Sequence, residues 1–240
     1  MLKNNLIQQC TCGNEVLFQK KTVNNISVLE CNDCGVIHQL LEGWDSKKLN
    51  DFYGHDYHKK FQEEKGVITY GDRYQHDCKV ADQRLDAYQS ILPIGTNGLD
   101  IGSSNSAFVH CATARGYSCV GLEIGEDIGD SSVTIRGALG EVDLNSEHWD
   151  WVAMHDSIEH MISVTSALKE VYRILKPKGQ VIIDLPDFWK PAGVHHWKLV
   201  EHLWFYTADQ MSALLKENGF EVKAIKEPIP GKLVFYAVKQ

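Results

Sequence analysis

The stretch NGLDIGSSNSAF, at positions 97–108, decides the fold of this chain. Its first half is a short apolar run of the kind that forms a buried strand, and its second half is a loop of small residues. The residues SAFVHCATARG, at positions 106–116, predict a helix closed by Gly116. A strand that passes through small residues into a helix lets a ligand approach the backbone closely. The segment therefore predicts a ligand-binding strand–loop–helix unit.

The same alternation continues on both sides of this unit. The segments 77–92, 163–179 and 208–220 predict helices, of which the second is closed by a Pro-Lys-Gly stop and the third has Gly219 beyond its end. Further strands are predicted at 117–125, 132–137, 149–156 and 180–186. Two last strands, at 221–231 and 232–240, are joined by a Pro/Gly turn and are expected to pair antiparallel. Strands that alternate with helices form a parallel, doubly wound sheet. We therefore predict an α/β domain over residues 76–240, with a Rossmann-like, seven-stranded, mostly parallel sheet and helices on both faces.

Polar residues end three of the predicted strands. Asp100 and Gly102 end the first strand, and His155 ends the fourth. Glu123 ends the second strand, 21 residues after Gly102. An open parallel sheet binds its ligand at the carboxyl ends of its strands, where the strand order reverses. A carboxylate at Glu123 could there accept two hydrogen bonds from a ribose diol, which predicts a nucleoside-containing cofactor.

The loop after the first strand departs from the glycine-rich fingerprint of dinucleotide-binding enzymes. Ser104 and Ser106 stand at the second and third glycine positions. A pyrophosphate needs close backbone approach at the helix N-terminus, and side chains at these positions hinder it. A nucleoside cofactor without a phosphate, such as S-adenosylmethionine, has less need of close approach to the backbone at the helix N-terminus. The loop favours that cofactor, and a nicotinamide-dependent oxidoreductase stays open as an alternative.

A cysteine-rich segment precedes the α/β domain. Residues 1–40 are too few to bury a core of their own, so they need a cross-link. Zinc held by four thiolates would supply it, and the cysteines placed for this are Cys10, Cys12, Cys31 and Cys34. Cys31 and Cys34 have the usual knuckle spacing, but the first pair is one residue short of it, which leaves His38 as a substitute ligand. We predict a zinc-ribbon-like module over residues 1–40.

Composition limits the remaining classes of function. The net charge of −8 repels phosphate backbones, so we expect no nucleic acid partner. No run of about 18 apolar residues is present, so we expect no membrane span. The start of the chain lacks the apolar core of a secretory signal, and the odd number of cysteines indicates reduced thiols, so a cytoplasmic location is expected. Residues 41–75 are predicted to form a connector that could cap a substrate with Tyr53 and Tyr57.

Residues from about 76 to 240 resemble the class I S-adenosylmethionine-dependent methyltransferases, particularly the type 23 subgroup. The resemblance rests on the order and spacing of LDIGSSNSAF (99–108), VGLEIG (120–125), WDWVAMHDSIEHM (149–161), LKEVYRILKPKGQVIIDLP (168–186) and EHLWFYTADQMSALLKENGFEV (201–222). The third and fourth of these motifs are the most specific, because dehydrogenases lack them. The cysteine module followed by FYGHDYH (52–58) also resembles relatives that carry a zinc-binding segment ahead of the catalytic domain.

The resemblance implies a set of cofactor-binding positions. Asp100 and Gly102 would lie beside the methionine part of S-adenosylmethionine, with Ser104 at the family's second glycine. Glu123 would hold the ribose hydroxyls. His155 would contribute backbone near the sulfonium end. The residues expected to border the adenine are Ile124, Ala138 and Leu139, although the family commonly has an acidic residue where Ala138 stands.

Methyl transfer is an in-line displacement in which the protein aligns donor and acceptor and sometimes removes a proton. Histidine suits the second task near neutral pH. His160 is the first candidate for the catalytic base, and His202 is the second. His195 and His196 could bind substrate or a divalent ion. We expect O-methylation of a small-molecule or saccharide acceptor; N- or C-methylation, a non-catalytic binding role and the oligomeric state stay open.

Overall fold

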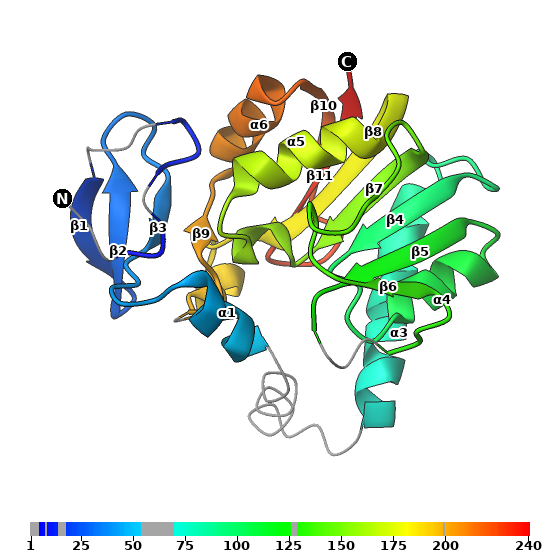
Figure 1. The fold of residues 1–240 in the computed structure, drawn as a ribbon, viewed down its shortest axis with the longest axis horizontal. Coiled ribbons are helices and arrows are strands. Elements are labelled where there is room, and N and C mark those ends of the chain that lie inside the picture. The colour runs from blue at the N-terminus through cyan, green and yellow to red at the C-terminus, as the bar shows by residue number, and fades with distance from the viewer. Residues whose placement is uncertain (1–4, 8, 14–17, 54–69, 126–128, 199) are drawn as a thin grey trace.

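The structure is a computed structural model, and it describes residues 5–7, 9–13, 18–53, 70–125, 129–198 and 200–240. Two sheets organise these residues (Figure 1). A seven-stranded sheet has the order β10-β11-β8-β7-β4-β5-β6, and a four-stranded sheet has the order β1-β2-β3-β9.

The seven-stranded sheet confirms the predicted Rossmann-like architecture. Its parallel strands are β4 (Asn97–Ile101), β5 (Ser118–Glu123), β6 (Thr134–Arg136), β7 (Trp149–His155) and β8 (Leu175–Pro186). The exception is the pair β10 (Phe220–Lys226) and β11 (Lys232–Lys239), in which β11 runs antiparallel to both β10 and β8. The chain adds β5 and β6 on one side of β4 and then β7 and β8 on the other. The strand order therefore reverses at β4 and β7, where this class of sheet binds its ligands.

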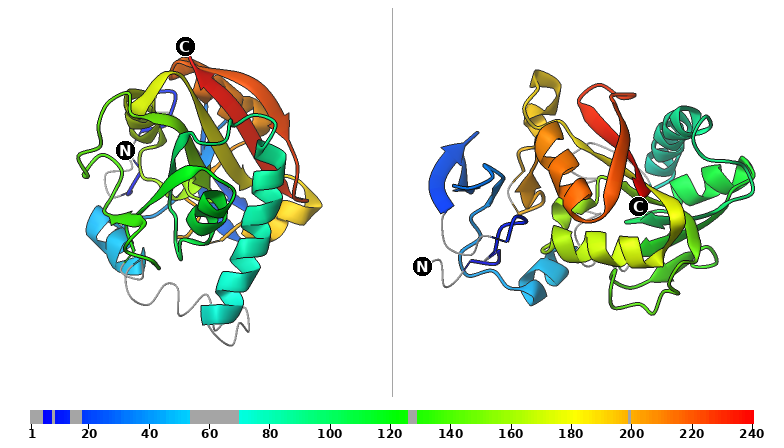
Figure 2. Two further views of the ribbon diagram at one scale, coloured as in Figure 1. Left: turned by 90° about the vertical axis from the view of Figure 1, so that its right-hand side faces the viewer. Right: turned by 90° about the horizontal axis from the view of Figure 1, so that it is seen from above.

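Alternating side chains of the central strands pack against helices on both faces of the sheet. On β7, Trp151 and Ala153 join the core of α3 (Tyr70–Tyr88) and α4 (Ala107–Ala114). Val152 and Met154 join the core of α5 (Val164–Ile174) and α6 (Ala208–Glu217) on the opposite face. The view from above in Figure 2 shows these two helix layers. Both faces are covered, and β7 accordingly reads as an almost continuous apolar run.

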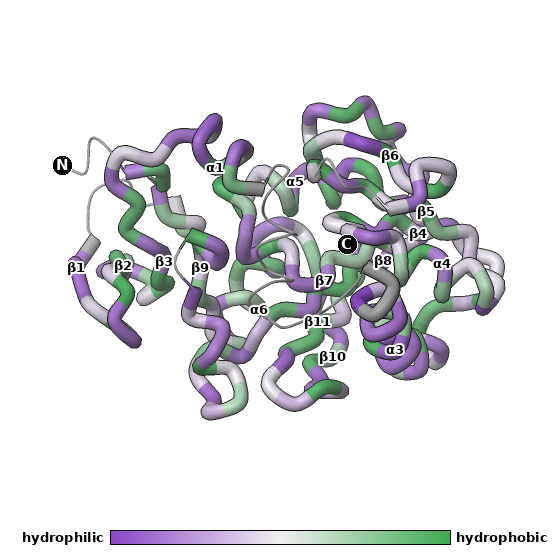
Figure 3. Tube along the Cα trace, turned by 90° about the horizontal axis from the view of Figure 1, so that it is seen from below, coloured by the Kyte–Doolittle hydropathy of each residue, from purple (hydrophilic) through white to green (hydrophobic). Residues whose placement is uncertain are grey.

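Two helix boundaries differ from the sequence-based prediction. Helix α3 begins at Tyr70 and ends at Tyr88, instead of spanning 77–92. Figure 3 shows that it is largely hydrophilic, so apolar periodicity does not mark its ends. Helix α5 ends at Ile174, and Leu175 already starts β8. A proline at position 177 disfavours the helical conformation of the residue before it, which explains the early strand.

The N-terminal sheet is completed by a strand from the α/β domain. Strands β1 (Phe18–Val23) and β2 (Ile26–Cys31) form a hairpin whose two-residue turn, Asn24 and Asn25, has positive φ angles. Strand β3 (Ile37–Gln39) pairs with β2 on one side and with β9 (Trp204–Phe205) on the other. In Figure 1, β9 lies between β3 and the seven-stranded sheet. The cysteine module is thus joined to the α/β domain by backbone hydrogen bonds.

The remaining described elements are one α-helix and two short 3-10 helices, namely α1 (Ser46–Tyr53), η1 (Ile158–His160) and η2 (Pro191–His196). The predicted cap falls largely outside the described residues, because positions 54–69, including Tyr57, belong to the undescribed part. The proposed boundaries at 1–40, 41–75 and 76–240 stay predictions. Over the described ranges, no helix is both long and apolar enough to cross a bilayer.

Candidate active site and cysteine cluster

Asp100 and His155 meet at the ends of the two strands where the strand order reverses. The Nδ1 atom of His155 lies 3.0 Å from a carboxylate oxygen of Asp100. On the other side of the ring, Nε2 lies 2.9 Å from the hydroxyl of Tyr88 on α3, and the Tyr88 ring stacks on the imidazole. All three side chains are buried. The chain of contacts fixes the carboxyl ends of β4 and β7 relative to each other and to α3.

The loop after β4 is built for close approach. Gly102 has a φ of +82°, and a Cβ atom on it would lie 2.8 Å from the Cβ of Ser157. Ser104 and Ser106 also have positive φ angles, of 48° and 64°. The loop therefore keeps the left-handed backbone that favours glycine, at roughly 1–3 kcal/mol of strain per residue. The backbone N–H of Ser104 donates to Glu123 at 2.7 Å, so this donor is already used and does not face a phosphate.

Glu123 ends β5 beside this loop. Its Oε2 accepts from the Ser104 N–H, and its Oε1 accepts from the N–H of Gly125 at 2.8 Å. Each carboxylate oxygen has a second lone pair, so a ribose diol could still be held. The neighbouring Ile124 leaves 47% of its surface exposed, and Leu139 is half-buried. A fixed carboxylate next to an exposed apolar side chain fits the ribose and the adenine of an adenosyl group.

Beneath the strand ends lies a charged network that the sequence analysis did not single out. The Arg84 guanidinium of α3 donates to Asp184 at 2.7 Å and to Asp156 at 3.0 Å, and Lys232 donates to Asp156 as well. Burial disfavours a charged Arg84, but the two carboxylates outweigh it and raise its pKa. Burial likewise raises the pKa of Asp156, and the two cations lower it by more. An aspartate inside the apolar run VIIDLP was the available signal.

Glu159, His160 and His202 come together in a second cluster, in which Glu159 and His202 are buried and His160 is half-buried. One ligand atom of each residue lies within 4.8 Å of the others. Glu159 and His160 belong to η1, which directly follows β7, and His202 precedes β9. The rings of His160 and His202 are 4.7 Å apart. The structure therefore brings the two predicted catalytic histidines together, and adds a glutamate beside His160 that the sequence analysis did not select.

Burial disfavours the charged form of each group in this cluster. It raises the pKa of Glu159 well above its ordinary value, and the charge of Asp156 adds to the effect. It also lowers the pKa of His160, and, together with the neighbouring His160, it lowers the pKa of His202. Nδ1 of His202 donates to the carbonyl of His196 at 2.5 Å. The neutral ring therefore carries its lone pair on Nε2, where it can accept a proton or bind a metal ion.

The other candidate histidines lie outside this cluster. His195 is exposed, and its ring contacts that of His196 at 4.0 Å. His196 supports His202 through its backbone carbonyl. His38 is buried and packs on the ring of Trp204, and it is not part of the thiol group.

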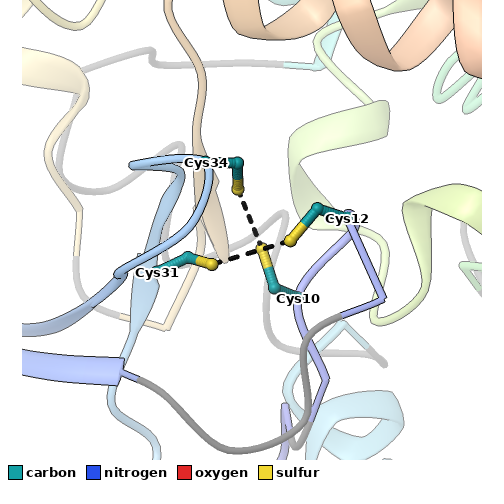
Figure 4. A group of neighbouring side chains, drawn as sticks. All are labelled: Cys10, Cys12, Cys31 and Cys34. Atoms are coloured by element: carbon teal, nitrogen blue, oxygen red, sulfur yellow. Dashed lines mark hydrogen bonds between the residues drawn. The ribbon is translucent and has the colours of Figure 1, made fainter.

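The four predicted cysteine ligands converge (Figure 4). The Sγ atoms of Cys10 and Cys34 are 3.5 Å apart, and those of Cys12 and Cys31 are 3.6 Å apart. Zinc–sulfur bonds of about 2.3 Å in a tetrahedron separate sulfur atoms by roughly 3.8 Å, so the donor set fits zinc. All four cysteines are free. The unusual Cys10-x-Cys12 spacing does not prevent convergence.

Burial and backbone hydrogen bonds shift the pKa values of three of these thiols in different directions. Burial raises the pKa of Cys10 well above its ordinary value, and it raises the pKa of Cys34 to about 11. At Cys31 hydrogen bonds from the backbone of Cys34 and Asp33 outweigh the burial and lower the pKa. A nearby cation would therefore be needed to hold all four groups as thiolates. The side-chain amide of Gln210 on α6 donates to the carbonyl of Cys34, which holds the knuckle against the α/β domain.

The fold and the site geometry define a class I S-adenosylmethionine-dependent methyltransferase. The family described as a methyltransferase domain, type 23, matches residues 72–225, and the chain belongs to this family. Among curated proteins, none matches the chain.

Solved structures share the fold at low sequence identity. A protein of Pyrococcus horikoshii is 17% identical with a TM-score of 0.61, and the match covers 78% of this chain and 99% of that protein. An S-adenosylmethionine-dependent methyltransferase of Thermotoga maritima is 21% identical with a TM-score of 0.56, covering 71% of this chain and 97% of its own. A third, from Mesorhizobium loti, is 16% identical with a TM-score of 0.56, covering 65% and 98%.

Proposed function

We propose that this methyltransferase transfers the methyl group to a hydroxyl oxygen of a small-molecule or saccharide acceptor. The observation that carries the proposal is the contact between the imidazole of His160, just beyond the end of β7, and the buried imidazole of His202, in surroundings that lower the pKa of both rings. A hydroxyl group is a poor nucleophile until its proton is taken up, whereas a neutral amine needs no such help to attack. Two imidazoles that can accept a proton, near the proposed position of the methyl donor, therefore favour an oxygen acceptor.

The cofactor side is assigned to residues around the strand ends. Glu123 would accept the ribose hydroxyls, and Ile124 and Leu139 would border the adenine. Asp100, Gly102 and Ser104 would line the methionine part, with the backbone of His155 near the sulfur. When bound, S-adenosylmethionine supplies a methyl group on a positively charged sulfur, which leaves as a neutral thioether when an acceptor oxygen displaces it.

The proton of the acceptor hydroxyl would go to the histidine pair. The donor bond from Nδ1 of His202 to the His196 carbonyl fixes its tautomer, so Nε2 faces outward from that bond as the proton acceptor. His160 lies against the same ring and would share the proton. Both rings are neutral in the resting protein because burial lowers their pKa values.

The acceptor class is tested by comparing hydroxyl and amine compounds. The Thermotoga relative is described as a possible histamine N-methyltransferase, which makes small amines the natural competitors in such a panel. Release of S-adenosylhomocysteine would be followed with sugars, phenols and amines as acceptors. We expect turnover with a hydroxyl compound, falling at least tenfold in His202→Ala. Turnover confined to amines would overturn the proposal.

We also propose that residues Cys10, Cys12, Cys31 and Cys34 hold one structural zinc ion, and that the protein works in the reducing cytoplasm. The support is the convergence of four free thiols, whose sulfur atoms all lie within 4.8 Å of one another. Elemental analysis after a mild chelator wash should find about one zinc per chain, lost in Cys31→Ser and retained in Cys78→Ser, whose thiol lies outside the group. A zinc-free protein whose Cys31→Ser variant unfolds at the same temperature as the parent would end this proposal.

A further inference from the structure

The carboxyl group of Glu159 is buried and makes no direct ion pair or hydrogen bond with a lysine or arginine side chain of the described residues, although the charge of Lys232 acts on it. Its side chain is completely buried, and neither carboxyl oxygen has a hydrogen-bond partner among the described residues. The ring of His160 lies beside it, with Nε2 3.7 Å from Oε1, beyond hydrogen-bond distance. A buried carboxyl group without partners costs about 1–3 kcal/mol or more. A ligand bound to the carboxyl group of Glu159 would supply the missing partners and offset this cost.

The surrounding atoms identify the class of that ligand. Two imidazoles and one carboxylate are a common ligand set of divalent transition metals, and they leave coordination positions open. A metal ion bonded at 2.0–2.4 Å to two atoms cannot span more than roughly 4.8 Å, and all three ligand atoms lie within 4.8 Å of one another. The bond from Nδ1 of His202 to the His196 carbonyl also leaves Nε2 as a metal ligand. A carbonyl that orients a ligating histidine in this way is typical of metal sites.

We propose that Glu159, His160 and His202 form a second metal site, which binds a divalent first-row transition-metal ion. The site differs from the cysteine cluster in its ligands, which are oxygen and nitrogen instead of sulfur. It also differs in its place, because Glu159 and His160 belong to η1, the first helical element after β7 of the methyltransferase sheet.

The ion gives the site a chemical role, which rests on the proposed hydroxyl acceptor. The acceptor oxygen would occupy an open coordination position and release its proton to water more easily, because the ion stabilises the resulting anion. With the ion bound, Nε2 of His202 would be a metal ligand and could not accept the proton. The ion would then promote deprotonation of the acceptor hydroxyl, as the histidine pair would in the metal-free protein. Metal dependence of turnover is then expected, with cofactor affinity unchanged.

Cobalt distinguishes the two sites in the full-length protein. Co²⁺ bound by thiolates gives an intense sulfur-to-metal charge-transfer band in the near ultraviolet, whereas Co²⁺ bound by nitrogen and oxygen gives only weak visible bands. Chelator-stripped protein would be titrated with Co²⁺ under reducing conditions, with both band regions recorded. We expect about two ions per chain, of which one produces no charge-transfer band.

Glu159→Gln and His202→Ala should weaken the second site at least tenfold and leave the thiolate band intact. Gln keeps the shape and the neutral state of the buried side chain, so Glu159→Gln should fold, which unchanged S-adenosylhomocysteine affinity would verify. His195→Ala removes a neighbouring exposed histidine and serves as the matched control. One ion per chain with only the thiolate band, or identical titrations of Glu159→Gln and the parent, would overturn the metal site. Ion binding with methyl transfer confined to amines would instead overturn the proposed acceptor and leave the metal site standing.

Discussion

The side-chain amide of Gln39 donates a hydrogen bond of 2.6 Å to the backbone carbonyl of His202. The same amide donates to the carbonyl of Lys198, and its oxygen accepts from the N–H of Val200 at 2.8 Å. Gln39 is the last residue of β3 and is completely buried. One side chain of the cysteine module thus holds the backbone of the segment that carries a catalytic candidate. The module therefore supports the segment that carries His202, which belongs to the proposed acceptor side of the active site.

Replacing Gln39 with leucine should loosen this segment. Leucine has a similar size but leaves two carbonyls and one N–H without their partner, at a cost of about 2–4 kcal/mol in unfolding free energy. Urea denaturation would measure the loss, and calorimetry should find S-adenosylhomocysteine binding within about twofold of the parent. Gln19→Leu, at an exposed position of β1, is the control and should stay within about 0.5 kcal/mol. Equal stability of both variants would remove Gln39 as the support of this segment.

Glu123→Ala should weaken binding of S-adenosylhomocysteine by roughly 1.5–3 kcal/mol, the scale of losing a charged hydrogen-bond partner. The variant removes the proposed acceptor for the ribose and also releases the N–H groups of Ser104 and Gly125. Isothermal titration calorimetry gives the affinity directly. Glu123→Gln, which retains the shape, should lose less. Glu217→Ala, at an exposed position of α6, controls for a general change of charge, and an affinity equal to this control would place the ribose elsewhere.

Most of the fold could be predicted from the sequence, because the patterns that predict its helices and strands lie within short stretches of the chain. The apolar runs around Leu99, Val152 and Ile182 pack on both faces of the sheet, and short runs of this kind are typical of buried parallel strands. The two residues of β9 carry no comparable signal, because their pairing with β3 depends on where the cysteine module docks. A two-residue strand has no period to detect.

The candidate site was predictable where function depends on residue type at strand ends, as for Asp100 and Glu123. Gln39 and Arg84 could not be found in this way. Their partners lie far along the chain, with His202 after Gln39 and Asp184 after Arg84. A polar residue inside an amphipathic helix, as Arg84 is, looks like a solvated side chain until the tertiary structure is known. Glu159 likewise stands out only once its burial is known.

Arg84→Met should destabilise the protein by about 3–5 kcal/mol. It leaves the buried carboxylate of Asp184 without its cation, and breaking one side of a buried ion pair is far more costly than never having formed it. Arg115→Met is the matched control, because Arg115, like Arg84, pairs with two aspartates. The partners of Arg115 are Asp82 and Asp86 of α3, and these ion pairs lie at the surface. It should cost less than about 1 kcal/mol. Urea denaturation at neutral pH compares the two, and similar losses would mean that the Arg84 network contributes no more than surface pairs.

Stability should fall on acidification in a way that depends on His38. Burial lowers the pKa of this histidine to about 4, whereas in the unfolded chain it has its ordinary value near 6.5. Below pH 6.5 the unfolded chain takes up a proton that the folded protein refuses, so His38 favours unfolding progressively more as the pH falls towards 4. Below that pH the folded form is protonated too, and the effect levels off.

A difference of about 2.5 pKa units corresponds to about 3 kcal/mol. Unfolding free energies of the parent and of His38→Gln, measured by urea between pH 7 and pH 4, should therefore approach each other by about this amount as the pH is lowered. Release of metal from the thiols and protonation of the other buried histidines occur in both proteins and cancel in the comparison. His76→Gln, at an exposed position of α3, should run parallel to the parent. If His38→Gln also ran parallel to the parent over the whole range, His38 would be protonated equally in both states, and its burial would carry no energetic cost.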